Sequence, residues 1–159
     1  MPEASSTRVF HSPDRNQKME ESNLIADIAQ KALIVDRGQV LIVKDSDRKW
    51  QLPGGRLHKD EDPERGLKRE IAEELGVDIE VFGVFDVGVF TTASSGQDHF
   101  LVVYLCRLLG DQEDIVPDPK EVAEMRWVAT SAEIMDLQEG AMMWKTYKDI
   151  LRKYFEGQR

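Results

Sequence analysis

The sequence has little of what a disulfide-bonded, membrane-spanning or secreted protein requires. It contains one cysteine, Cys106, which excludes an internal disulfide bond and a zinc site with several cysteine ligands. No apolar run approaches the roughly 20 residues of a membrane-spanning helix. The first residues also lack the apolar core of a signal peptide. We therefore expect a protein of the reducing cytoplasm, without membrane contacts.

Positive charge is scarce as well. The 159 residues include 21 lysines and arginines against 30 aspartates and glutamates, a formal net charge of −9. Such a chain lacks the broad basic surface that holds extended nucleic acid. A small anionic substrate remains compatible with it, because a bound cation reverses the local sign of a site. The hydrophobic fraction of 41% is sufficient for one domain with a real core.

The apolar residues divide the chain into an extension and a domain. Residues 1–23 are polar, and we interpret them as an extension without a packed core, with a short added strand as the alternative. Residues 24–159 are expected to form a single domain. The apolar runs 31–35 and 39–44 flank Asp36-Arg37-Gly38 and predict a hairpin whose strands are buried on both faces.

Helix signals surround residues 63–75. Asp62 is a good cap, proline suits the first helical position, and Gly76 suits the end of the helix. Leu67, Ile71 and Leu75 recur every four residues and predict a buried stripe.

Further elements are predicted on both sides of residue 108. Strands are expected at 79–90, 100–107 and 125–128, and a short helix capped by Ser131 at 132–137. A final helix carries its apolar residues on one face: Met143, Tyr147, Ile150, Leu151 and Tyr154. Strands mixed with helices, without regular βαβ repetition, predict an α/β or α+β sandwich around a mixed β-sheet.

Glu70, Glu73 and Glu74 form an acidic cluster within the predicted helix. Their spacing places the three carboxylates on one surface, where like charges repel unless they are paired. One interpretation is a solvated helix face in an acidic protein. The other is a metal site, because the cluster borders the apolar stripe and follows Pro53-Gly54-Gly55, whose backbone can approach a ligand closely. Mg²⁺ prefers such oxygen ligands.

The cluster belongs to a longer pattern with fixed spacing. Its residues are Gly55, Glu61, Arg69, Glu70, Ile71, Glu73, Glu74, Gly76 and Val77. This pattern resembles the Nudix box at every specified position, and Leu52-Pro53-Gly54 precedes it as in many members of that family. Seven of these nine residues, the glycines, the glutamates and the arginine, are exact matches. Seven exact matches at this spacing occur by chance on the order of once in a million chains of average composition. The resemblance implies a Nudix-type α/β/α sandwich.

The resemblance also implies a reaction, which is hydrolysis of a pyrophosphate bond in a nucleotide derivative with Mg²⁺ or Mn²⁺ as cofactor. By motif position, Glu73 and Glu74 would be the principal metal ligands. Glu70 would be a further ligand or the base acting on water, and the Gly54 carbonyl would complete the ligand set. Glu61 and Arg69 would be a structural pair that orients the catalytic helix.

Candidates outside the box carry alternatives. Family members often place one more acid after the box; Glu121 is favoured here and Glu124 is the alternative, and each also fits an exposed acid beside a strand. Arg56 could contact phosphate or simply be solvated. His58 and His99 are expected to be structural or exposed, with a substrate contact as the less favoured interpretation.

The substrate is narrowed by elimination. Residues 92–94 are Thr, Ala and Ser. The proline that is typical of family members acting on ADP-ribose is therefore absent, and so is the tyrosine typical of those acting on diadenosine polyphosphates. A MutT-like hydrolase of nucleoside or deoxynucleoside triphosphates is expected, with nucleotide sugars or ADP-ribose as alternatives. The partner is thus a small-molecule nucleotide, and a homodimer is compatible with the family. A non-catalytic nucleotide- or partner-binding Nudix module is the alternative of another class, which an intact box disfavours.

Overall fold

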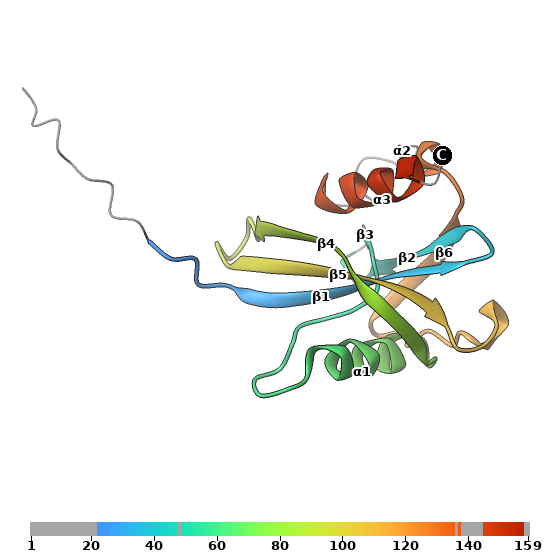
Figure 1. The fold of residues 1–159 in the computed structure, drawn as a ribbon, viewed down its shortest axis with the longest axis horizontal. Helices are drawn as coiled ribbons and strands as arrows, with labels where there is room; N and C mark the ends of the chain where they lie inside the picture. Colours follow the sequence, from blue (N-terminus) through green and yellow to red (C-terminus); the bar gives the residue numbers. More distant parts are fainter. Residues whose placement is uncertain (1–21, 48, 136, 138–144, 158–159) are drawn as a thin grey trace, which may run out of the picture.

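A mixed β-sheet lies between two layers of helices in the computed structural model, which describes residues 22–47, 49–135, 137 and 145–157 (Figure 1). The strands are β1 (Asp27–Asp36), β2 (Gln39–Asp45), β3 (Trp50–Gln51), β4 (Ile79–Thr91), β5 (Asp98–Leu108) and β6 (Val122–Val128). The helices are α1 (Pro63–Leu75), α2 (Ser131–Met135) and α3 (Lys145–Gly157), with a 3-10 turn at Gln112–Asp114. The predicted α+β sandwich is confirmed.

Strand β1 occupies the centre of the sheet. The strand order is β3-β2-β1-β5-β4, and β6 pairs with the other side of β2. β1 and β5 run parallel, from Asp27 opposite His99 to Ile34 opposite Cys106. The other strand pairs are antiparallel, so the sheet is mixed as predicted.

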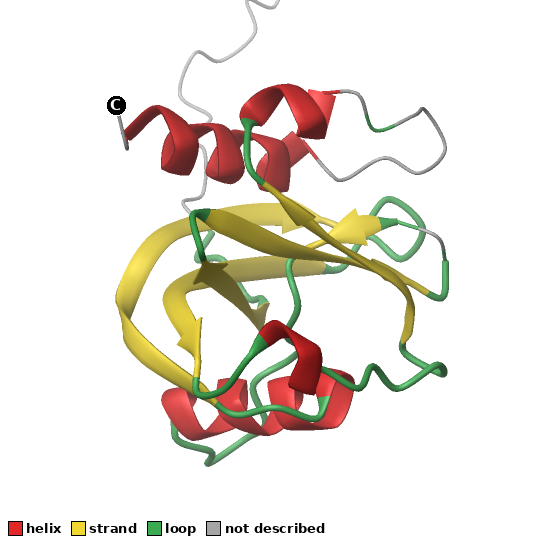
Figure 2. Cartoon of the chain, turned by 90° about the vertical axis from the view of Figure 1, so that its right-hand side faces the viewer, coloured by secondary structure: helices red, strands yellow, loops and turns green. Residues whose placement is uncertain are grey.

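The sheet is covered on both faces, by α1 on one side and by α2 and α3 on the other (Figure 2). Side chains alternate across a strand, so β1 contributes to both cores. Ala32 and Ile34 belong to the apolar cluster of α1, whereas Ala29 and Leu33 belong to that of α3. This double burial explains the continuous apolar run in β1 and confirms the predicted hairpin of buried strands.

Helix α1 begins and ends as its sequence predicts. The Asp62 side chain accepts a hydrogen bond from the Arg65 N–H at 3.0 Å, and proline occupies the first helical position. Gly76 adopts the left-handed conformation with φ of 66°, and its N–H donates to the Ala72 carbonyl. Leu67, Ile71 and Leu75 are fully buried against the sheet. The other face of α1 is thereby available to the acidic cluster.

Some elements differ from the prediction or lie outside the described residues. The short helix begins at Ser131, and the Thr130 hydroxyl accepts from the Glu133 N–H, so Thr130 is the capping residue. Strand β3 was not predicted, because two residues are too short to show alternation. Residues 1–21 of the predicted extension, and Met143 of the predicted final helix, fall outside the described part of the chain. Among the described residues, no helix is long and apolar enough to cross a membrane.

Candidate active site

The turn formed by Pro53, Gly54 and Gly55 lies directly against helix α1. The Gly54 N–H donates to the Glu74 Oε2 at 2.9 Å. Gly55 faces Glu70 so closely that a Cβ at Gly55 would lie 2.2 Å from the Glu70 Oε2. Two carboxylates of the acidic cluster therefore contact the backbone of the turn, and a side chain at Gly55 would displace one of them.

Strand β1 holds the opposite side of the same turn. Backbone hydrogen bonds join the Gln30 N–H to the Gly55 carbonyl at 2.8 Å and the Ala32 N–H to the Pro53 carbonyl at 2.9 Å. Gly54 has a φ of 131°, and a Cβ there would lie 2.3 Å from the Gln30 carbonyl oxygen. Glycine at this position meets both the backbone conformation and the close approach of β1.

Arg69 connects the loop before α1 to the acidic face of the helix. Its Nε and Nη2 donate to the two oxygens of Glu61 at 2.8 and 3.0 Å, a forked geometry that matches a carboxylate. Its Nη1 donates to the Glu70 Oε1 at 2.7 Å. The hydrogen bonds from Arg69 lower the pKa of Glu61 to about 2.

The three helix carboxylates differ in their surroundings. Glu74 is the most enclosed, and burial raises its pKa to about 7 against the opposing effects of Lys31 and of the Gly54 N–H. Glu70 is held between Arg69 and Gly55. Glu73 is more than half exposed and lies 3.6 Å from Arg69. The cluster thus combines one buried carboxylate, one restrained carboxylate and one facing solvent.

Lys31 is a buried cation that the sequence interpretation did not single out. Its side chain projects from β1, and the residue is only 8% exposed. Its Nζ donates to the Gly54 carbonyl at 2.9 Å and to the Gln51 Oε1 at 3.0 Å. Burial lowers the pKa of Lys31, and the carboxylates of Glu74, Glu70 and Asp45 oppose that shift. The available signal was a lysine at the start of an apolar run that is buried on both faces.

The two downstream acids lie in different environments. Glu124 accepts from Lys44 at 3.1 Å and from Arg126 at 3.4 Å, so its charge is already balanced on the sheet. Glu121 belongs to the loop that the Asp118 N–H ties to the Glu74 carbonyl at 2.9 Å. The charge of Glu121 acts on Glu74 and contributes to its raised pKa. The structure therefore brings Glu121, and not Glu124, toward the acidic cluster.

A cleft of about 370 Å³ opens beside the turn on the α3 side of the sheet. Lys31, Gly55 and Arg56 line one part of it, and His99 and Tyr147 line another. Arg56 is largely exposed and lies 3.7 Å from Asp27, so it is available to an anion in the cleft.

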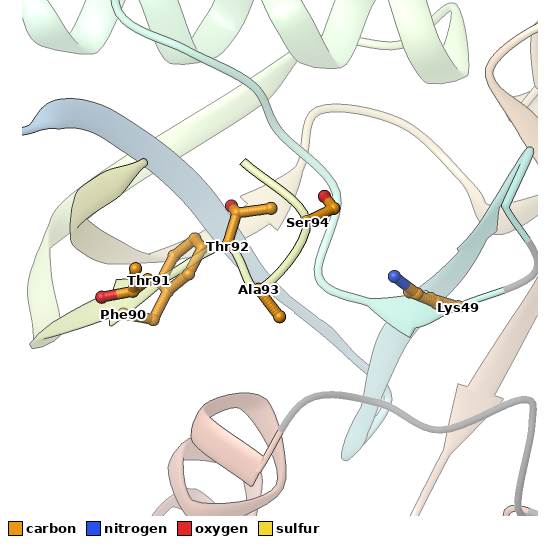
Figure 3. Close-up of a pocket in the computed structure, with 6 residues that line it drawn as sticks. All are labelled: Lys49, Phe90, Thr91, Thr92, Ala93 and Ser94. Carbon is orange, nitrogen blue, oxygen red and sulfur yellow. The ribbon is translucent and has the colours of Figure 1, made fainter. Parts of the chain in front are cut away.

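His99 also lines the cleft and is 5% exposed. Its ring stacks on Phe90 with centroids 4.7 Å apart, and its Nε2 lies 2.9 Å from the Thr92 hydroxyl. An adjoining cavity of about 390 Å³ is lined by residues 90–94 and by Lys49, which directly precedes β3 (Figure 3). His58 lies elsewhere, on the exposed loop beside Glu61.

A family model for the NUDIX domain matches residues 28–151, which is most of the chain. The chain belongs to the Nudix hydrolase family. This Nudix hydrolase is 30% identical over 118 residues to a MutT-like protein of Streptomyces ambofaciens, covering 69% of this chain and 74% of that protein. It is 31% identical over 133 residues to the nucleoside triphosphatase NudI of Enterobacter sp. (strain 638), which covers 75% of this chain and 94% of that protein.

The fold of this Nudix hydrolase is also found among solved structures. A MutT NUDIX hydrolase from Burkholderia pseudomallei matches it with a TM-score of 0.66 and 26% identity, over 80% of this chain and 97% of that chain. A NUDIX hydrolase from Nitrosomonas europaea matches with a TM-score of 0.70 and 18% identity, over 85% of this chain and 92% of that chain.

The donor set of the Nudix hydrolase suits a hard divalent cation. Glu70 and Glu74 present carboxylate oxygens at the turn, and such oxygens are the ligands that Mg²⁺ and Mn²⁺ prefer. The charge of Glu74 is also costly to bury, and Lys31 offsets that cost only in part. Within the described ranges, no three His, Cys, Asp or Glu side chains already converge on one point. The residues fit the ion by the chemistry of their donor atoms.

Proposed function

We propose that this Nudix hydrolase cleaves a pyrophosphate bond of a nucleoside or deoxynucleoside triphosphate in a metal-dependent, MutT-like reaction. The observation that carries the proposal is the contact of Glu70 and Glu74 with the Gly54–Gly55 turn at the edge of a cleft. The relatives that match most of the chain support the substrate class, since they are a MutT-like protein and a nucleoside triphosphatase.

Glu73 and Glu74 are proposed to hold Mg²⁺ or Mn²⁺, with Glu70 as a further ligand or as the base and the Gly54 carbonyl within reach. When bound, the cation neutralises phosphate charge and lowers the pKa of the attacking water. Because burial raises the pKa of Glu74 to about 7, this carboxylate becomes ionised, and able to hold a cation, as pH rises through neutrality.

Glu70 is the proposed base because its two carboxylate oxygens have different contacts. Arg69 holds Oε1, whereas Oε2 lies against Gly55 at the turn. The Oε2 atom would take the proton from the attacking water, and Arg69 would keep the carboxylate oriented while it does so. Glu121 is proposed as the additional acid, because its charge acts on Glu74 while Glu124 is paired with Lys44.

The cleft on the α3 side is the proposed place of the nucleotide. Arg56 and Lys49 line it with positive charge suited to phosphate oxygens. Phe90 adds apolar surface to the lining, and Thr92 and Ser94 add hydroxyl groups (Figure 3). A nucleoside with an attached phosphate chain requires this combination of an apolar surface and cationic groups.

The test is release of phosphate or pyrophosphate from a substrate panel. The panel holds the dNTPs, 8-oxo-dGTP, ADP-ribose, nucleotide sugars and diadenosine polyphosphates, each with Mg²⁺, Mn²⁺ or EDTA. We expect metal-dependent turnover of triphosphates, and loss of that turnover by orders of magnitude in Glu74→Gln, which removes the ligand charge but keeps the shape of the side chain.

Glu64→Gln is the matched control, because Glu64 is an exposed carboxylate of the same helix, paired with Lys68. It should keep wild-type turnover. Equal activity in Glu74→Gln and the wild type would refute the metal assignment. Silence of the folded wild type across the whole panel, with nucleotide still bound, would instead support a binding module.

A further inference from the structure

The backbone of Gly54 is held by opposite charges, one at its N–H and one at its carbonyl. Its N–H donates to the carboxylate of Glu74, and its carbonyl accepts from the ammonium of Lys31. The φ of 131° and the close approach of the Gln30 carbonyl leave Gly54 little room to move. Lys31 and Glu74 are therefore linked through a single residue, Gly54, although they are 43 positions apart in the sequence.

Lys31 is also tied to the floor of the cleft. Its second hydrogen bond goes to the Gln51 Oε1, and the Gln51 amide donates to the Asp45 Oδ2 at 2.9 Å. The Asp45 Oδ1 in turn accepts from the Lys49 N–H at 2.8 Å. This chain fixes the ammonium in place, so Lys31 is a preorganised positive charge within the site.

The charges that face Lys31 are the carboxylates of Glu74, Glu70 and Asp45. Two of these three are proposed to serve the divalent cation. A buried ammonium would be costly by itself, and it is compensated here by the same negative charge that would attract the cation. The Gly54 carbonyl is likewise shared, because it already accepts from Lys31.

We propose that Lys31 is an internal counter-ion that occupies the Gly54 carbonyl and offsets the charge of Glu74 until a divalent cation binds. This inference rests on the proposed function, since it concerns the cation of that same site. Lys31 keeps the turn and α1 assembled without metal. It also weakens cation binding, because two positive charges at one site repel and both require the same carbonyl. Lys31 thus sets the metal concentration at which the site fills.

The experiment compares Mn²⁺ binding to the metal-free full chain by electron paramagnetic resonance and by calorimetry. Lys31→Met removes the ammonium but keeps an unbranched side chain. We expect it to bind Mn²⁺ about five- to tenfold more tightly than the wild type, the range of a moderate coupling between two sites. Its melting temperature without metal should be lower, and the increase on adding Mn²⁺ should be larger.

Lys44→Met is the matched control, because it removes the same charge from the neighbouring strand β2, where Lys44 pairs with Glu124. It should leave Mn²⁺ affinity unchanged. Lys31→Gln keeps a hydrogen-bond donor without the charge, and it provides the same comparison if Lys31→Met does not fold. Tighter Mn²⁺ binding in that variant also supports the proposal.

The outcomes separate this inference from the proposed function. Mn²⁺ binding that is weaker or unchanged in the Lys31 variants, with normal binding by the wild type, overturns the counter-ion role alone and leaves Lys31 as a structural support of Gly54. Absence of Mn²⁺ binding by the wild type and by every variant overturns both. A purely structural role predicts weaker binding, so the direction of the change decides.

Discussion

Arg69 shows how a single residue can organise the acidic cluster. Two nitrogens of its guanidinium group bind Glu61 and so join the loop to the helix. The third nitrogen binds and orients Glu70. A lysine would carry the same charge but could not make the two parallel hydrogen bonds. The geometry explains why an arginine, and not merely a cation, suits this position.

At this scale we predict that Arg69→Ala lowers both activity and melting temperature, with Arg69→Lys recovering only part of each. The loss should depend on pH. The pKa of Glu61 is about 2 in the folded protein against an ordinary value of 4.5, so the stabilisation is present above pH 4.5 and is lost as pH falls toward 2. Melting curves of wild type and Arg69→Ala at pH 7, 4 and 2.5 should therefore converge at low pH. A gap that stays constant would contradict the role of Glu61.

The Gly54–Gly55 turn is the element that brings β1 and α1 together. Its two glycines face different neighbours, which makes their roles separable. A Cβ at Gly54 would meet the Gln30 backbone, which cannot move without disturbing β1. A Cβ at Gly55 would first meet the carboxylate end of the Glu70 side chain, which can change rotamer more easily than backbone can move.

We predict that Gly54→Ala and Gly55→Ala separate stability from catalysis. Gly54→Ala should lower the melting temperature strongly, because it combines a backbone clash with a positive φ. Gly55→Ala should melt close to the wild type but lose roughly 10²–10⁴-fold in kcat, the range for loss of a positioned acid–base group. Thermal melts and turnover of both variants provide the check. Full activity in Gly55→Ala would exclude Glu70 Oε2 as the proton acceptor.

At the scale of the whole molecule, two apolar cores share one sheet. Ile71 belongs to the core under α1, and Ile150 to the core under α3. Both cores depend on the same central strand, because Ala32 and Leu33 of β1 point into opposite ones. Loss of one core removes the support of the strand that the other requires.

We therefore predict a single cooperative unfolding transition that both cores control. Ile71→Ala and Ile150→Ala should each reduce the free energy of unfolding by about 2–5 kcal/mol without splitting the transition. Ile25→Ala, at an exposed position, is the control and should change it little. Calorimetry distinguishes the outcomes, since two resolved transitions in either core variant would show that the cores unfold independently. The possible homodimer stays a prediction.

Much of the fold could be predicted because its signals are local. The cap at Asp62, the left-handed Gly76 and the stripe of Leu67, Ile71 and Leu75 act within one helix. The same reasoning failed for β3, which is too short for a pattern, and for the cap of α2, where Thr130 and Ser131 are adjacent and equally suitable. Local chemistry predicts an element well when several residues agree on it.

The sequence by itself determined the box and the helix that carries it, because spacing along one helix dictates which side chains share a face. The resemblance of that box indicated the family. Only the tertiary structure decided which groups meet that face. The path of the turn along β1 places Lys31 on Gly54. The later loop brings Glu121 toward Glu74, while Glu124 pairs with Lys44. Contacts between residues far apart in sequence depend on strand order and burial, which no local spacing contains.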